Sequence, residues 1–100
     1  MEDKKEINIE LSPEVAKGSY SNFSIVTHSP NEFIVDFVEM LPGLPKAQVV
    51  SRIIMTPENM KRLNRAINDN IKKFEEIFGE IKLHGEGPII PMGPNNNTKS

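Results

Sequence analysis

One apolar pattern constrains this chain more than any other, and it lies between residues 56 and 79. Large apolar residues recur there at spacings of three and four, which places them on one face of an α-helix. Thr56-Pro57-Glu58 supplies a capping hydroxyl, a first-turn proline and an acid near the positive helix end, and Gly79 is placed to end the helix. The pattern predicts one long amphipathic helix with a buried face. Its apolar members are Met60, Leu63, Ile67, Ile71, Phe74 and Phe78, widened by Ala66 and Ile77.

Four segments before this helix carry the signals of β-strands. Residues 7–11 alternate apolar and polar side chains, and Ser12-Pro13 breaks the run. Residues 13–18 are a connector that can hold one helical turn, with Ser12 as its N-cap. Aromatic and β-branched residues then fill residues 20–28, 33–40 and 47–55.

Turn residues separate the last three of these strands, at His28-Ser29-Pro30-Asn31 and at Pro42-Gly43-Leu44-Pro45. Consecutive strands joined by short turns pair as antiparallel hairpins. We therefore predict an α+β fold in which a four-stranded antiparallel β-meander precedes one long helix that packs on one face of the sheet.

Folding each hairpin about the centre of its turn predicts which residues share a face. Phe23 would lie opposite Phe37, and Val35 would lie between Ile25 and Ile53, with Phe33 and Met55 on the same nearly apolar face. We expect the helix to cover this face. The opposite face is predicted to be mixed and to carry Asn22, Ser24, Val26, His28, Ile34, Asp36, Val38, Val50, Arg52 and Ile54.

Composition divides the chain into a charged N-terminal tail at residues 1–6, a single domain at 7–81 and a tail rich in Gly, Pro and Asn at 82–100. The second tail has too few large apolar residues to offset its ordering entropy, so we predict that it is disordered. Its Pro88-Ile89-Ile90-Pro91 segment could dock on a partner in an extended form.

Charge and cysteine content exclude several classes of function. A formal net charge of -2 provides no field that attracts phosphate backbones, so nucleic-acid binding is disfavoured. The chain has no cysteine, and therefore no disulfide, thiolate metal site or catalytic thiol. The charged N-terminus is unlike a secretory signal, and no apolar run is long enough to cross a membrane, so we expect a cytoplasmic protein.

Asp36 and Arg52 form the most informative polar pair, because the second hairpin places them directly opposite each other on the mixed face. Ser24 would extend this row. The pair is interpreted either as a cross-strand ion pair that fixes register or as a binding site for a charged ligand. The structural interpretation is favoured, because no glycine-rich loop or third ionisable group accompanies the pair.

The turn at His28, Ser29 and Asn31 is the other candidate recognition element. A histidine, a hydroxyl and the nearby Glu32 could suggest catalysis, but such residues within one turn usually orient the turn itself. Neither His28 nor His84 has a second ligand at metal-binding spacing. We therefore predict no catalytic residue, no metal and no cofactor.

Several short segments resemble a family of small bacterial proteins that is known only as a domain of unknown function, over roughly residues 7–81. The order of strands followed by a helix is also similar to the SecB-type export chaperones, which form oligomers and hold unfolded chains. These resemblances imply a fold and no activity. The segments that resemble the family of unknown function are Ser21-Asn22-Phe23, His28-Ser29-Pro30-Asn31-Glu32-Phe33, Asp36-Phe37, Leu41-Pro42-Gly43, Val50-Ser51-Arg52, Thr56-Pro57, Asn70-Ile71 and Phe78-Gly79.

These patterns favour a non-enzymatic interaction or assembly protein, most simply a homodimer, because a lone helix covers only one side of a sheet. The alternatives are SecB-like holding of unfolded chains, a small-molecule or enzymatic site near Asp36, Arg52, Ser24 and His28, and nucleic-acid binding. The residues predicted to form the interface are Val26, Ile34, Asp36, Val38, Val50, Arg52 and Ile54.

Overall fold

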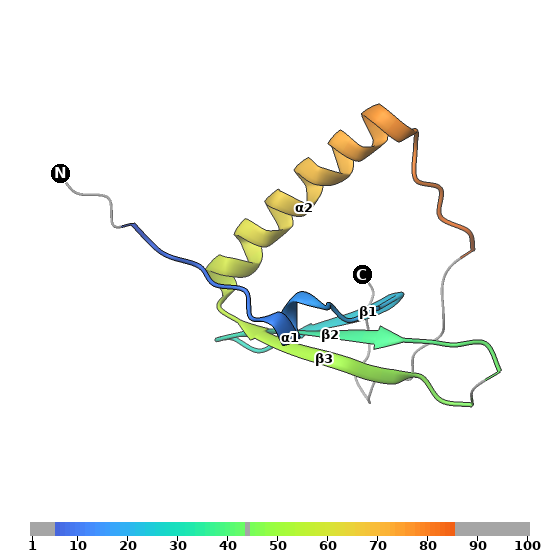
Figure 1. The fold of residues 1–100 in the computed structure, drawn as a ribbon, viewed down its shortest axis with the longest axis horizontal. Helices are drawn as coiled ribbons and strands as arrows, with labels where there is room; N and C mark the ends of the chain where they lie inside the picture. Colours follow the sequence, from blue (N-terminus) through green and yellow to red (C-terminus); the bar gives the residue numbers. More distant parts are fainter. Residues whose placement is uncertain (1–5, 44, 86–100) are drawn as a thin grey trace. The chain divides into compact units, whose positions relative to one another are not determined.

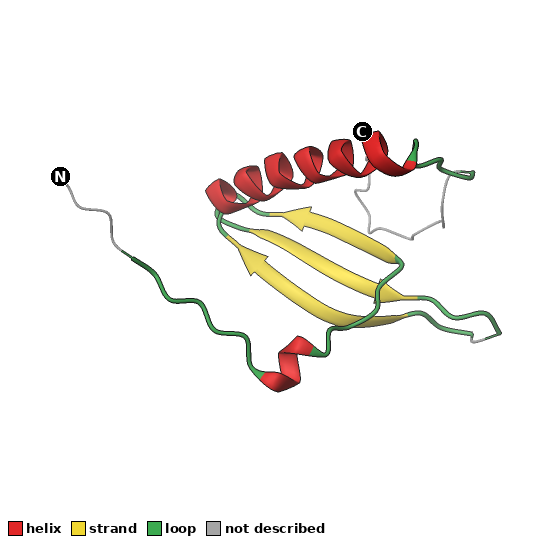
Figure 2. Ribbon diagram, turned by 45° about the horizontal axis from the view of Figure 1, so that its top comes forward, coloured by secondary structure: helices red, strands yellow, loops and turns green. Residues whose placement is uncertain are grey.

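A computed structural model describes residues 6–43 and 45–85 of the chain. A short helix α1 (Pro13–Ala16) precedes three strands and a long helix (Figure 1). The strands form one antiparallel sheet in the order β1-β2-β3, and all three are visible in Figure 2. The bounds of the strands and the long helix are β1 (Phe23–His28), β2 (Phe33–Glu39), β3 (Gln48–Met55) and α2 (Pro57–Phe78).

The chain divides into two compact units whose boundary falls inside α2, after Asn64. The first unit contains the sheet and the beginning of α2. The second unit contains the remainder of α2 and the segment after it. Most of the predicted C-terminal tail, and all but one residue of the N-terminal tail, lie outside the described residues.

The strand predicted at residues 7–11 is not seen, which corrects the predicted four-stranded sheet to three strands within the described part of the chain. Residues 7–11 have no strand assignment, and Ile7, Ile9 and Leu11 are exposed. Alternation supplies side chains suited to a half-buried strand, but the backbone still needs a neighbouring strand for its hydrogen bonds. The connector prediction is confirmed, because Ser12 caps α1 by accepting a hydrogen bond from the Val15 N–H at 3.3 Å.

The predicted register between the first two strands is wrong by one residue. Phe23 lies opposite Val38, Ile25 lies opposite Asp36, and Val26 lies opposite Val35. The cause is the length of the turn, where the Ser29 N–H donates to the carbonyl oxygen of Glu32 at 2.9 Å. A one-residue change in register moves every side chain of a strand to the other face.

The register between β2 and β3 agrees with the prediction as far as Phe37. Asp36 lies opposite Arg52, and Phe37 lies opposite Ser51. The pairing then shifts, so that Val38 lies opposite Val49. Val50 is therefore the extra residue of a β-bulge, which redirects side chains that strict alternation would place on the other face.

Asn22 fixes the beginning of β1 against the end of β2. Its side-chain amide donates to the carbonyl oxygen of Met40 and accepts from the Met40 N–H, both at 2.9 Å. The backbone N–H of Asn22 donates to the carbonyl oxygen of Val38, and the Ser21 hydroxyl donates to the same oxygen at 2.9 Å. These bonds hold the observed register at the end of the hairpin that is far from its turn.

Buried side chains are concentrated on the central strand. Val35 and Val38 are the buried apolar residues of the described chain, each 5% exposed, and Asp36 is also buried. A central strand is covered by neighbours on both sides, whereas β1 and β3 each have one free edge within the described residues. Because Val35 and Asp36 point to opposite faces, the sheet has buried groups on both of its faces.

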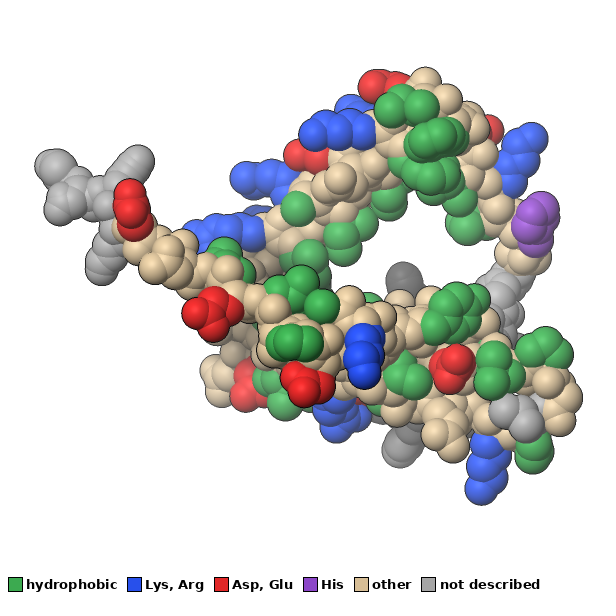
Figure 3. Space-filling model, viewed as in Figure 1, with side chains coloured by type: hydrophobic (Ala, Val, Ile, Leu, Met, Phe, Trp, Pro, Cys, Tyr) green, Lys and Arg blue, Asp and Glu red, His purple; other side chains and the backbone are tan. Residues whose placement is uncertain are grey.

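Helix α2 confirms the helix prediction at both ends. The Thr56 hydroxyl accepts from the Asn59 N–H at 3.1 Å, and Gly79 adopts a positive φ of 98°. The Glu75 carboxylate accepts from the Ile81 N–H at 2.9 Å beyond this glycine. Figure 3 shows hydrophobic side chains along one side of the helix and charged side chains along another, yet no residue of α2 is buried.

Candidate interaction surface

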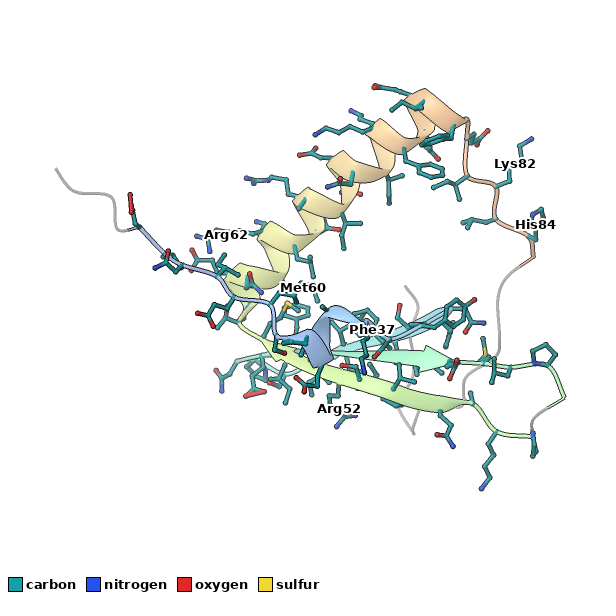
Figure 4. All side chains as sticks on the ribbon, in the orientation of Figure 1. Phe37, Arg52, Met60, Arg62, Lys82 and His84 are labelled. Atoms are coloured by element: carbon teal, nitrogen blue, oxygen red, sulfur yellow. The ribbon has the colours of Figure 1, made fainter. Side chains whose placement is uncertain are left out.

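The observed register defines two sheet faces, which we name after Asp36 and Phe37. Phe37 and Arg52 are labelled on opposite sides of the sheet in Figure 4. The Asp36 face carries Phe23, Ile25, Thr27, Ile34, Asp36, Val38, Val49, Arg52 and Ile54. The Phe37 face carries Ser24, Val26, His28, Phe33, Val35, Phe37, Ser51, Ile53 and Met55.

Asp36 and Arg52 form a two-bonded ion pair near the middle of the Asp36 face. The Arg52 Nε–H donates to Asp36 Oδ1 at 2.7 Å, and the Nη2–H donates to Oδ2 at 2.9 Å. The Asp36 side chain is 12% exposed and the Arg52 side chain is 60% exposed. The predicted cross-strand pair is therefore confirmed, with its carboxylate covered and its guanidinium open.

Hydrogen bonding within the pair shifts both pKa values. The bond from Arg52 lowers the pKa of Asp36, and the positive charge of Arg52 lowers it further, while burial of the carboxylate opposes both. The bond to Asp36 raises the pKa of Arg52. Both groups therefore stay charged at neutral pH. A paired carboxylate and guanidinium do not form an acid/base couple that could move a proton. This geometry suits a structural link between β2 and β3.

Four residues that we predicted on the mixed face belong to the Phe37 face instead. Val26 and Ser24 move there because the first hairpin has a different register, and His28 moves with them. Val50 lines a cavity together with Phe37, Ser51 and Ile53, which places it on this face at the bulge. Ser24 and His28 are consequently separated from Asp36 and Arg52, and the predicted four-residue ligand site is not assembled.

The sequence interpretation missed Phe23, Ile25 and Val49, which take their places on the Asp36 face. Phe23 and Ile25 are half-buried, and Val49 is 55% exposed. The turn between β1 and β2 carried the signal for their register. The Ser29 hydroxyl accepts a hydrogen bond from the Asn31 N–H at 3.2 Å, which favours a tight four-residue loop. No comparable signal marks the bulge at Val50.

An open cavity of about 320 Å³ lies on the Phe37 face. Its lining is apolar with three hydroxyl groups and contains no titratable side chain, so it offers no acid, base or charged anchor for catalysis. The cavity suits an apolar side chain better than a reactive substrate. It is lined by Ser19, Ser21, Phe37, Val50, Ser51 and Ile53.

The predicted recognition turn is stabilised by its own residues. The Ser29 hydroxyl bonds to the Asn31 backbone, and the His28 ring lies 5.5 Å from the Phe33 ring between their centroids. These contacts agree with the interpretation that the turn residues orient the turn. Within residues 6–43 and 45–85, no group of three or more His, Asp or Glu side chains could hold a metal ion. No described helix is long and apolar enough to cross a membrane.

Fold and surface together place this chain among small α+β proteins. In the described residues a three-stranded antiparallel meander, with an ion pair between its second and third strands, leads into a long amphipathic helix. A family model described as "Protein of unknown function (DUF3467)" matches residues 1–83, and the chain belongs to that family. This confirms the resemblance to a family of unknown function. Comparisons with curated proteins and with solved structures gave no match.

Proposed function

We propose that this protein is a non-enzymatic assembly module that associates with a second copy through the Asp36 face. The observation that carries the proposal is a cross-strand pair of apolar residues, Ile34 and Ile54, beside the Asp36–Arg52 ion pair. Ile54 is 57% exposed. One long helix can cover only one face of a sheet, so at least one of the two apolar faces needs a cover from outside the chain.

Energetics supports an external cover. Ordering the backbone costs roughly 1 to 2 kcal/mol for each residue, and a small domain offsets this cost by burying apolar side chains. In the described chain only two apolar side chains, Val35 and Val38, are buried. Association adds buried surface to the folded state and couples folding to binding, as in dimers that have no stable monomer.

The chemistry of the Asp36 face suits a contact between identical copies. Interfaces combine an apolar centre with satisfied polar groups, and arginine is enriched in them. Asp36 is already paired, so covering it leaves no uncompensated charge. Arg52 has further N–H groups and an open side chain, which could donate across a two-fold axis to acceptors of the second copy.

Aspartate substitutions at Ile34 and Ile54 test the proposal. We expect each to halve the mass of the native assembly in light scattering or sedimentation, because a carboxylate would be trapped in an apolar contact. Val26→Asp on the Phe37 face is the matched control and should leave that mass unchanged. Circular dichroism confirms that the variants are folded. Unchanged mass in both folded variants would refute this interface.

The same variants separate assembly from the holding of unfolded chains. A SecB-like function predicts that the protein suppresses the aggregation of denatured clients, whereas the assembly proposal requires no such effect. If the wild type is monomeric and both aspartate variants still protect clients from aggregation, the holding function would replace the assembly proposal.

A further inference from the structure

Residues 7–11 have the side-chain pattern of a β-strand but pair with no strand of the described chain. Ile7, Ile9 and Leu11 are 77%, 88% and 68% exposed. This segment and the sheet belong to the same compact unit, and Figure 2 shows the segment leading away from the sheet. An extended arm with three exposed apolar side chains on one face is suited to adding a strand to the sheet of another molecule.

The outer edge of β3 is able to receive such a strand. Hydrogen-bonded and non-hydrogen-bonded pairs alternate along antiparallel strands, and the bond from the Ser29 N–H to Glu32 makes these two residues a hydrogen-bonded pair. Counting from that pair through the registers of the three strands, the backbone groups of Arg52 and Ile54 point away from β2. They therefore lie on the free edge of the sheet.

Nothing in the sequence of residues 51–55 blunts this edge. Natural edge strands are usually protected by lysine, proline or a β-bulge, and residues 51–55 contain neither lysine nor proline. The bulge at Val50 ends the regular edge on one side. The regular part is thus five residues long, which is also the length of the segment at residues 7–11.

Arg52 provides a charged group that fixes where an added strand would lie. Its Nε and Nη2 groups bind Asp36, which leaves Nη1 to donate to a second acid, and the side chain is 60% exposed. In an antiparallel pair that places Glu10 opposite Arg52, the carboxylate and the guanidinium share the Asp36 face. The acidic residue of the segment would then meet the only charged residue of the edge.

The same register aligns the apolar residues of the segment with the Phe37 face. Ile7 would lie opposite Met55, Ile9 opposite Ile53, and Leu11 opposite Ser51. Ser51 and Ile53 also line the open cavity, which suits apolar side chains. The arm would therefore extend the apolar part of this face.

Other alignments lose one of these matches. A shift of one residue moves Glu10 to the Phe37 face and places an apolar residue opposite Arg52. A shift of two residues keeps the faces but separates Glu10 from Arg52. The free edge of β1 (Phe23–His28) contains neither arginine nor lysine, so it offers Glu10 no such cation.

We infer that residues 7–11 of one copy add as an antiparallel strand to the free edge of β3 in a second copy. Length, apolar face and charge match between two segments of one sequence, which an unrelated partner would not explain. The chain's own β3 is not the receiving edge, because the structure leaves that edge open while the arm leads away from it. Reciprocal exchange of two arms gives a closed dimer with two-fold symmetry.

This strand contact uses the edge of β3 and does not rest on the proposed contact through the Asp36 face. Ile34 lies on the central strand, so Ile34→Asp should abolish the face contact and leave the strand contact. Substitution of Glu10 should weaken the strand contact and leave the face contact. The failure of either proposal can therefore be distinguished from the failure of the other.

Cysteine cross-linking of the full chain tests the inference, because the native sequence has no cysteine. Ile9 and Ile53 would form a non-hydrogen-bonded pair, whose close Cα atoms suit a disulfide. Ile9→Cys and Ile53→Cys would be purified separately, mixed, unfolded, refolded and oxidised. We expect far more disulfide-linked dimer in the mixture than with either variant alone. Leu11→Cys mixed with Ser51→Cys provides a second pair in case the Ile53 variant does not fold.

Asn8→Cys mixed with Ile53→Cys is the matched control and should give no linked dimer, because residue 8 would face the opposite side of the sheet. The double variant Ile9→Cys/Ile53→Cys separates two copies from one, and it should give disulfides between chains. A disulfide within single chains would show that the arm folds onto its own sheet and would overturn the inference. Absence of a linked dimer in both mixtures would also overturn it.

Glu10→Lys tests the proposed register through charge. Like charges would then lie opposite each other at Arg52, so we expect the dimer Kd in sedimentation equilibrium to rise about tenfold. Glu6→Lys makes the same change of charge just outside the segment and should leave the Kd nearly unchanged. Equal effects of the two variants would contradict the pairing of Glu10 with Arg52.

Discussion

Asp36 and Arg52 lie directly opposite each other on β2 and β3 and differ strongly in exposure, with the acid covered and the base open to solvent. Two hydrogen bonds, at 2.7 and 2.9 Å, join their side chains. The covered carboxylate therefore depends on the Arg52 guanidinium to compensate its charge. The free energy of unfolding should therefore respond differently to the loss of each partner.

The ion pair makes stability dependent on acid pH. Because the pKa of Asp36 is lowered in the folded state, its stabilisation is complete above the unfolded pKa, near 3.8, and is lost as the pH falls through the folded value. Asp36→Asn should remove this part of the pH dependence. Urea unfolding between pH 7 and pH 3 measures it. Asp69→Asn, at an exposed site on α2, should keep the wild-type slope, and an equal slope in Asp36→Asn would contradict the assignment.

Replacing Arg52 should weaken that dependence. Arg52→Ala removes the hydrogen bond and the positive charge that lower the pKa of Asp36, so less stability should be lost in acid than in the wild type. Arg52→Lys should restore part of the wild-type behaviour, since an ammonium cannot form the two-bonded fork. An equal dependence on pH in the Ala variant and the wild type would refute this account.

Asn22 should contribute to the pairing of β1 with β2. Asn22→Ala removes two hydrogen bonds with Met40, and we expect it to lower the free energy of unfolding by about 1 kcal/mol because the site is exposed. Chemical denaturation measures the loss, and faster exchange of the Met40 amide hydrogen locates it. Unchanged exchange would show that this contact does not hold the strand.

Val35 should be the most sensitive apolar residue of the sheet. It is 5% exposed on the central strand, so Val35→Ala should cost about 2 kcal/mol through lost burial and the cavity left behind. Val26 lies opposite Val35 and is 52% exposed, so Val26→Ala is the matched control. It should lower the free energy of unfolding by about 0.5 kcal/mol or less. Equal losses in denaturation experiments would mean that Val26 is covered in the native assembly.

The end of α2 should depend on the conformation of Gly79. Its φ of 98° is strained for any residue with a side chain, so Gly79→Ala should cost about 1 kcal/mol. Among the described residues other than its two chain neighbours, no atom lies within 4 Å of the added methyl group, so the cost comes from backbone conformation. Thermal unfolding measures it. Gly79→Asn, which tolerates this conformation better, should recover part of the loss.

Local signals predicted the long helix and the Asp36–Arg52 pair. Thr56, Pro57 and Gly79 mark the helix ends through bonds and conformations within a few residues, and the helix was found between them. The turn centred near Leu44 placed Asp36 opposite Arg52 by counting along the chain. In both cases the information lies close to the element that it determines.

The rest of the Asp36 face could not be predicted, because it depends on one-residue differences. The Ser29 to Glu32 turn shifted Ile25 onto this face and Val26 away from it, and the bulge at Val50 exchanged that residue for Val49. A strand has a period of two, so each single-residue difference changes the face completely. Composition and alternation are nearly unchanged by such shifts.

The sequence by itself determined the α+β order of elements, the ends of the helix, the helical turn after Ser12 and the charged pair at Asp36 and Arg52. Tertiary structure alone decided the register of β1, the bulge in β3 and the absence of a strand at residues 7–11. The physical reason is the distance along the chain over which each interaction acts. Caps and periodicity act within a few residues, whereas strand membership and register depend on hydrogen bonds to a distant partner whose position the local pattern does not contain.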